Sequence, residues 1–383
     1  MKKIQNDGLE DKIKDLALSH GANLVGICSA TSLEDKDFSD PHYLLPDAKS
    51  VITYAIKFDD EIVMNYLLKR NYDDYLKLCH EEGDVTKQLK KIGDKLKGFL
   101  EEKGYEAVNC DCNFNYRNVN KKGESVVNSL RLLIDLINKQ KDETQKLTKK
   151  EKKTLGLLKR MILAGLRNTP MNLIPNFSHR CAAVAAGLGR IGWSGNLVTK
   201  DYGARILLNS VITDAKLEAD APLKDNPCVG CKLCEKACQG GLFSRNESQT
   251  VKINDMKETI GQRNSYAYCI AVCSGMIGQN KFQEWSTWSP YTLEDRDNLP
   301  QDDTVEEYVQ NMFADNVEHG GKRAQNVLRL VENTYLGRNK KPAEDFRPSC
   351  GFCQLVCAGT MQKKKTSYKA IINSGNWKNK KNE

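Results

Sequence analysis

Four cysteines in a short run after Pro227 have the clearest potential for chemistry. Their spacing is Cys228-x2-Cys231-x2-Cys234-x3-Cys238. This spacing is typical of a half-site for [4Fe–4S] clusters, in which three thiolates bind one cluster and the fourth binds a neighbouring cluster. Four-cysteine zinc sites usually pair two Cys-x2-Cys knuckles, so the run favours iron–sulfur clusters over zinc.

A second cysteine run near the C-terminal end supplies part of a matching half-site. It is spaced Cys350-x2-Cys353-x3-Cys357, which leaves one ligand missing. Cys269 and Cys273 are the cysteines between the two runs, so one of them should complete the set. The expected ligands are Cys228, Cys231, Cys234 and Cys357 for cluster 1, and Cys238, Cys350, Cys353 and either Cys269 or Cys273 for cluster 2.

Composition sets the cellular context that we expect. The chain has 383 residues and 14 cysteines, unevenly placed, which argues against a disulfide framework. No apolar run is long enough to cross a bilayer, and the first residues lack the apolar stretch of a signal peptide. We therefore expect a cytoplasmic protein with no membrane partner.

The net charge of +8 is concentrated in two lysine-rich stretches, residues 139–153 and 363–381. Such runs are most often solvated surfaces. They could also dock an acidic electron donor, a ferredoxin or a flavodoxin. No aromatic residues are interleaved with these lysines, so a nucleic-acid partner is not favoured.

Hydrophobic periodicity predicts a mixed α/β core before the cysteine runs. Strands are expected at residues 24–28, 50–56, 105–108, 196–199 and 205–213, and helices at 9–20, 60–103 and 179–186. A helix pair around a polar linker at 138–153 is expected to form an insertion at about 123–166. This alternation of strands and helices predicts an α+β layered fold.

The turn after the last of these helices contains Gly187-x-Gly189-x-x-Gly192. By its letters this matches a dinucleotide-binding fingerprint, which belongs between a strand and a helix. Here a helix precedes the glycines and a strand follows them. The turn therefore does not predict a nicotinamide or flavin site.

Residues around this turn resemble a known family. The segment from Ala185 to Thr199 reads AAGLGRIGWSGNLVT and is followed by the first cysteine run. Together with residues 21–27 and 45–52, it is similar to the cobalamin-dependent iron–sulfur reductases, which comprise the reductive dehalogenases and the epoxyqueuosine reductases. In the latter an isolated cysteine completes the second cluster, and Cys269 stands at the corresponding place.

The resemblance implies the architecture and cofactors. It implies a nitroreductase-like α/β cobalamin-binding core in residues 1–220, a bacterial ferredoxin-like 2[4Fe–4S] module in residues 221–365 with an insertion at about 280–345, and a basic tail in residues 366–383. Cobalamin in this family binds without a protein histidine below the cobalt. The residues expected to contact it are Gly187, Gly189, Arg190, Gly192, Trp193, Ser194 and Gly195.

The resemblance also bears on the reaction. Reductive cleavage needs a proton donor, for which Tyr116, His179 and Arg180 are candidates. Epoxyqueuosine reductases carry a catalytic aspartate where residues 172–177 have no carboxylate, and a lysine where this chain has Trp193. We therefore expect an anaerobic, reductive-dehalogenase-like enzyme with a small organic substrate, and we disfavour epoxyqueuosine reduction. The alternatives are a corrinoid-free electron-transfer protein and a reductive activator of another corrinoid protein.

Overall fold

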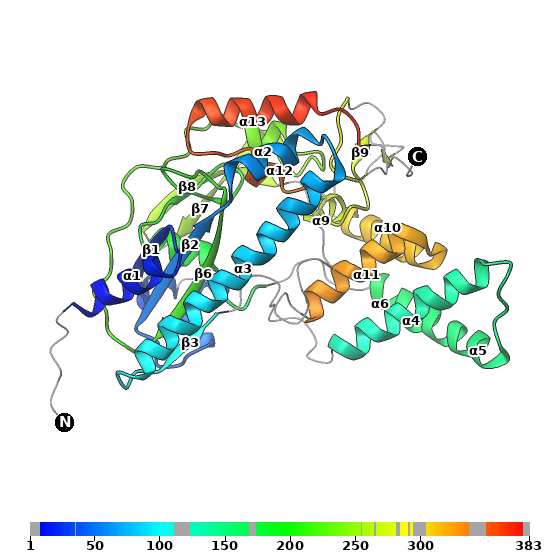
Figure 1. Cartoon of the computed structure of the whole chain (residues 1–383), viewed down its shortest axis with the longest axis horizontal. Coiled ribbons are helices and arrows are strands. Elements are labelled where there is room, and N and C mark those ends of the chain that lie inside the picture. Colours follow the sequence, from blue (N-terminus) through cyan, green and yellow to red (C-terminus); the bar gives the residue numbers. More distant parts are fainter. Residues whose placement is uncertain are drawn as a thin grey trace.

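A four-stranded antiparallel sheet forms the centre of the computed structural model (Figure 1). The structure describes residues 8–34, 36–110, 123–167, 174–253, 255–263, 266–280, 284–289, 292–293, 304–336 and 350–377. The strand order is β1 (Leu24–Ser29), β2 (Ser50–Lys57), β6 (Ile206–Thr213) and β3 (Ala107–Asn109). This mixed α/β architecture confirms the broad fold class predicted from the sequence.

Helices cover both faces of this sheet. Because side chains alternate along a strand, Ile52 and Tyr54 of β2 pack on one side with α1 (Leu9–Ser19) and α3 (Tyr72–Glu101). Val51 and Ala55 point to the other side, where α7 (His179–Ala185) packs. The result is a three-layer core, with α7 delivering the chain directly into the glycine turn.

The sequence predicted a single helix over residues 60–103, and this prediction is wrong in one respect. The structure has two helices in this region, separated by a short break. Helix α2 (Asp60–Leu68) ends at Lys69, whose backbone is left-handed with φ 49°. Helix α3 then starts after Asn71, whose side-chain oxygen accepts the Asp74 N–H at 3.0 Å. A left-handed residue and an N-cap in close succession force a bend that hydrophobic periodicity does not reveal.

Two segments that are far apart in the sequence pack into one helical unit. The first comprises α4 (Gly123–Lys141), α5 (Lys149–Leu158), a π-helical turn (Lys159–Leu163) and α6 (Ala164–Arg167), and the second α10 (Val305–His319) and α11 (Gly321–Leu336). Val127, Ile134, Val309 and Val327 share one buried core. Figure 1 shows this unit beside the sheet core, with α9 (Tyr266–Cys273) next to α10.

The remaining elements are short and surround the cysteine runs. They are the 3-10 turns Ala30–Leu33 and Pro41–Tyr43, the strand pairs β4 (Arg190–Ile191) with β5 (Leu197–Val198) and β9 (Gln279–Asn280) with β10 (Thr292–Leu293), the hairpin β7 (Phe243–Ile253) to β8 (Met256–Arg263), and the helices α8 (Leu233–Lys236), α12 (Phe352–Leu355) and α13 (Met361–Asn373). The β7–β8 hairpin was not predicted. Within the described residues, no helix combines the length and apolar content needed to cross a bilayer.

Close packing of β1 against the end of α7 gives a test of the core. A Cβ at Gly26 would overlap the Ala186 carbonyl oxygen and lie 2.5 Å from Leu188 Cδ1. Gly26→Ala should therefore lower the free energy of unfolding by about 1–3 kcal/mol, measured by urea denaturation.

Gly98→Ala is the matched control, because a Cβ at this position of α3 meets nothing within 4 Å. It should raise the free energy of unfolding by about 0.5–1 kcal/mol, since alanine restricts the unfolded chain and favours helix. Equal urea midpoints for Gly26→Ala and the unsubstituted protein would contradict the packing.

Candidate metal centre

The first cysteine run lies in a tightly turned loop around α8. Gly230 and Lys232 have left-handed backbones, with φ 66° and 54°, which let the loop double back within a few residues. The Cys228 N–H donates to Asn226 Oδ1 at 2.8 Å. Cys228 Sγ in turn accepts the backbone N–H of Trp193 at 3.4 Å, so the glycine turn contacts the first cysteine directly.

The second cysteine run is attached to the core at several points. The Ala204 N–H donates to the Cys357 carbonyl at 2.7 Å, and Arg205 Nε donates to the Leu355 carbonyl at 2.7 Å. At the other end of the run, the Tyr66 hydroxyl donates to the Cys350 carbonyl at 2.7 Å. These bonds position the run at the end of the sheet where β6 begins.

Cysteines from both runs meet in a first group, formed by Cys228, Cys231, Cys234 and Cys357. Burial raises the pKa of the Cys234 thiol to about 12, and the negative charges of Cys357, Cys228 and Cys231 contribute to the rise. Burial also raises the pKa of Cys357, with contributions from Cys228 and Cys231. The structure thus brings together the four residues expected at cluster 1.

A second group combines Cys238, Cys269, Cys350 and Cys353. Burial raises the pKa of Cys353 well above its ordinary value, and the charges of Cys269, Cys238 and Cys350 add to this. Burial raises the pKa of Cys238 to about 12, although its sulfur accepts the Leu242 N–H at 3.4 Å. The four residues expected at cluster 2 therefore lie together.

Cys273 is a fifth thiol beside this second group. Its sulfur lies 3.9 Å from Cys269 Sγ, and it also hydrogen-bonds to Cys350. The contacts with Cys273 lower the pKa of Cys269 and of Cys350 and raise the pKa of Cys273. Cys238 and Cys353 both interact with Cys269, whereas the strongest interactions of Cys273 are with Cys269 and Cys350.

Neither group is arranged for a single metal ion. Among the described residues, no three His, Cys, Asp or Glu side chains are close enough to hold one ion. A single zinc ion draws its sulfur ligands to about 2.3 Å from one centre, whereas a cubane spreads four thiolates over four irons. Both groups receive backbone N–H donors of the kind that tune cluster sulfurs, from Trp193 to Cys228 and from Leu242 to Cys238.

The glycine turn is filled by the protein's own chain. A Cβ at Gly187 or Gly189 would collide with the carbonyl oxygen of Ala221 or Val198, and one at Gly192 would lie 3.3 Å from Cys228 Sγ. These contacts account for the three glycines without a ligand. Expected cofactor contacts of the turn therefore remain predictions.

Arg190 and Trp193, which were also expected at the corrinoid, have partners within the chain. Arg190 is buried, forms an ion pair with Glu258 and donates to the carbonyls of Leu223 and Lys224 at 2.8 and 2.9 Å. Trp193 Nε1 donates to Glu235 Oε2 at 2.9 Å. These contacts fix the turn against the hairpin and the first cysteine loop.

Two arginines converge on the remaining residues of the turn. Arg180 Nη1 donates to the Gly195 carbonyl at 3.2 Å, and Arg263 Nη2 donates to the Ser194 carbonyl at 3.3 Å. Burial and the neighbouring Arg180 charge lower the pKa of Arg263, while the Cys269 and Cys353 thiolates favour its charged form. Sequence reasoning missed Arg263, because nothing in the hairpin's sequence shows that it reaches the second cysteine group.

Two of the three proton-donor candidates, His179 and Arg180, lie within the described residues. His179 is buried in the core, where its Nδ1 lies 3.0 Å from Ser210 Oγ and its ring meets Phe177 edge-on. Arg180 is exposed at the turn. Tyr116 lies outside the described residues. A catalytic role for any of them remains a prediction.

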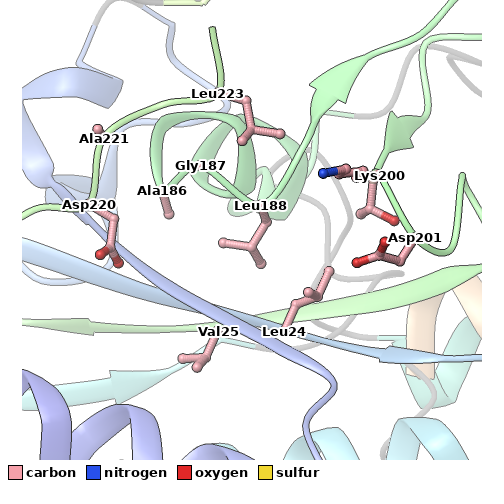
Figure 2. A pocket seen from close by; sticks show the side chains of 11 residues that line it. Leu24, Val25, Ala186, Gly187, Leu188, Lys200, Asp201, Asp220, Ala221 and Leu223 are labelled. Carbon is pink, nitrogen blue, oxygen red and sulfur yellow. The ribbon is translucent and has the colours of Figure 1, made fainter. Parts of the chain in front are cut away.

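A cavity of about 390 Å³ opens beside the glycine turn, on the side of β1 (Figure 2). Its lining includes Leu24, Gly187, Leu188, Lys200 and Asp220. Asp220 already accepts hydrogen bonds from Lys14 Nζ at 2.5 Å and from the Ile27 N–H at 2.8 Å. The volume is at the lower end of the range for drug-sized ligands, about 300–1,000 Å³. The expected corrinoid contacts of the turn are neither supported nor contradicted by this cavity.

The chain has relatives in two classes of reductase. It is 39% identical over 56 residues to epoxyqueuosine reductase from Synechocystis sp., a match that covers 15% of this chain and 19% of that protein. It is 30% identical over 129 residues to tetrachloroethene reductive dehalogenase from Desulfitobacterium hafniense, covering 27% and 22%. The chain thus spans about a fifth of the length of these relatives. No protein-family profile matches it.

Solved structures of both classes also align with the fold. A selenomethionine-labelled epoxyqueuosine reductase aligns over 96% of this chain and 99% of its own, with 14% identity and a TM-score of 0.40. The reductive dehalogenase NpRdhA aligns over 88% and 37%, with 13% identity and a TM-score of 0.40. These scores are too low to carry an argument, so the relationship rests on the sequence matches. Over part of its length the chain is similar to epoxyqueuosine reductases and to tetrachloroethene reductive dehalogenases, the two classes of reductase that its resemblance predicted.

Proposed function

We propose that the protein is an iron–sulfur oxidoreductase in which two [4Fe–4S] clusters deliver low-potential electrons to a corrinoid. The observation that carries the proposal is that two distant cysteine runs meet in two groups of four thiols. A cubane takes up and releases one electron at a time, and hydrogen bonds to its sulfurs and burial tune its potential. The sequence relationship to two classes of reductase supports the same reading.

Ligand assignment follows the two groups. Cluster 1 would be held by Cys228, Cys231, Cys234 and Cys357, and cluster 2 by Cys238, Cys269, Cys350 and Cys353. Ligating thiols must lose their protons, so binding of iron offsets the cost that burial places on the thiolate form. We assign Cys269 as the ligand and Cys273 as a neighbouring thiol, whose sulfur lies 3.9 Å from Cys269 Sγ and which also contacts Cys350.

The proposed domain organisation is the one expected from the sequence. Residues 1–220 would form the nitroreductase-like core, residues 221–365 the ferredoxin-like module and residues 366–383 a tail. The strands of the central sheet all precede residue 220, and the two thiol groups all follow it, which supports the division. The helical unit would then consist of one insertion from each part, at about 123–166 and 280–345.

The corrinoid part of the proposal rests on the relatives and not on the glycine turn. Cobalamin is the cofactor implied by the sequence resemblance to reductive dehalogenases and epoxyqueuosine reductases. Since the turn's glycines pack against the chain itself, a second candidate function is a cluster-only electron-transfer protein. A reductive activator, which passes electrons to a corrinoid on another protein, belongs to the same alternative.

A small organic substrate, as in the dehalogenases, is our proposal for the reaction. Both classes of reductase match the chain, and one aligned structure holds a tRNA stem-loop, so the comparisons give no support to excluding epoxyqueuosine or a nucleic-acid partner. Segment 172–177, whose lack of a carboxylate prompted that exclusion, lies partly outside the described residues. Activity assays should therefore include halogenated organic compounds and epoxyqueuosine in tRNA.

An electron donor must dock on the surface. Helix α5 exposes Lys149, Lys150, Lys152 and Lys153. A ferredoxin or flavodoxin, both commonly acidic, would complement this charge. The association should then weaken as the salt concentration rises.

Substitution of the cysteines between the two runs tests the ligand assignment. Cys269→Ala should lower the iron content of the anaerobically reconstituted protein from about eight to about four irons per chain, because cluster 2 loses a ligand. Cys273→Ala is the control and should keep both clusters, since we assign it no iron. Loss of iron from Cys273→Ala alone would show that the assignment of these two cysteines is reversed.

Corrinoid binding tests the choice between the two candidate functions. The clustered protein, mixed with hydroxocobalamin and passed through a gel-filtration column, should retain the corrinoid. The EPR spectrum of its cobalt(II) form should lack axial nitrogen coupling, because the chain has no Asp-x-His-x-x-Gly motif to supply a lower ligand. Passage of all cobalamin through the column, with clusters intact, would select the cluster-only function.

A further inference from the structure

Lys69 is a buried cation beside the second cysteine group. Its residue is only 6% exposed, and its ammonium group donates to the Ser286 carbonyl. Its Nζ also lies 5.7 Å from the centre of the Phe352 ring. Phe352 stands between Cys350 and Cys353 in the sequence. Among the described residues, the Cys350 thiolate favours the charged form of the Lys69 ammonium group.

The backbone at Lys69 indicates that the side chain has a specific role. Its φ of 49° and ψ of 44° are left-handed, a conformation that usually ends a helix on glycine. A residue with a Cβ pays about 1–2 kcal/mol there. Burial adds a second cost, because it disfavours the ammonium and lowers its pKa to about 7. Both the left-handed backbone and the burial of the ammonium group are unfavourable, so their occurrence together at Lys69 suggests a function for this residue.

The end of α2 holds Lys69 in place. Tyr66, one turn earlier, donates its hydroxyl to the Cys350 carbonyl at 2.7 Å and meets the Phe352 ring edge-on with centroids 6.1 Å apart. Trp288 Nε1 donates to the Tyr66 carbonyl at 3.2 Å. Lys69 is therefore attached to a packed aromatic cluster and not to a flexible surface loop.

We infer that Lys69 raises the reduction potential of the cluster held by Cys238, Cys269, Cys350 and Cys353, and so favours its one-electron reduced state. This inference rests on the proposed function, in which these cysteines bind a cubane. Reduction adds one electron from a low-potential donor and therefore one negative charge to the cluster. A fixed positive charge nearby stabilises that product more than the oxidised cluster, and the effect is strong because little water screens it.

Arg70, the next residue, provides a matched control. It is also cationic but exposed, so solvent screens its charge. Lys69→Arg keeps the charge at every accessible pH, whereas Lys69→Met removes it with a side chain of similar length. Lys69→Gln removes the charge but retains a donor for the Ser286 carbonyl.

Redox titration followed by EPR tests the inference on the anaerobically reconstituted full chain. The signal of cluster 2 is identified as the one that Cys269→Ala removes. Lys69→Met and Lys69→Gln should shift the cluster 2 equilibrium toward the oxidised form by about tenfold, which is about 59 mV for one electron. At about pH 6, where Lys69 carries its charge, Lys69→Arg and Arg70→Met should keep the cluster 2 potential of the unsubstituted protein, and cluster 1 should be unchanged in every variant.

The iron content of each variant distinguishes failure of the Lys69 inference from failure of the proposed function. Unchanged iron with an unchanged cluster 2 potential in Lys69→Met and Lys69→Gln would overturn the role of Lys69 and leave the proposed function intact. Loss of cluster 2 iron from both variants would also overturn it, because Lys69 would then hold the fold of the site. Absence of clusters from the unsubstituted protein would refute the proposed function, and the inference with it.

Discussion

The two cysteine runs are separated in the sequence by a long, mainly helical insertion, yet they must lie next to each other in the fold. A buried arginine, Arg205, fixes the position of the second run, residues 350–357. Arg205 is only 2% exposed at the start of β6. It donates to the Leu355 carbonyl, to Asp60 of α2 at 2.8 Å and to Ser367 of α13. Burial lowers its pKa, and Asp60 favours its charged form. A buried guanidinium is tolerated only when its donors are satisfied, so this cation ties sheet, α2, α12 and α13 into one arrangement.

This arrangement gives the two thiol groups different surroundings. The second group has cations close to it, Lys69 from the end of α2 and Arg263 from the β7–β8 hairpin. Near the first group, buried Lys364 favours the thiolate form of Cys357. Positive charge beside sulfur ligands favours an added electron, so the number and depth of these cations would set how electrons divide between two otherwise similar clusters.

Local sequence signals predicted much of the fold but not the contacts between distant segments. The strands of the sheet follow from runs of β-branched residues. Spacing predicted most members of the two cysteine groups, whereas the choice of Cys269 over Cys273 came from the family resemblance. Neither the break of the long helix at Lys69 nor the β7–β8 hairpin was predicted, since a left-handed lysine and a polar hairpin carry weak local signals. The family resemblance assigned the glycine turn to the corrinoid, which stays a prediction, and the structure adds that Val198 and Cys228 of the same chain lie next to Gly189 and Gly192. Contacts of this kind between distant segments can be seen only in the tertiary structure.

The central claim is that the eight cysteines of the two groups hold two cubanes. Mössbauer spectroscopy of the anaerobically reconstituted protein tests this most directly, because it reports the nuclearity and the oxidation state of all the iron. The account predicts that essentially all the iron is in [4Fe–4S] clusters, in two populations with different surroundings. Mononuclear iron, iron in [2Fe–2S] form alone, or a protein that takes up zinc in preference to iron would contradict it.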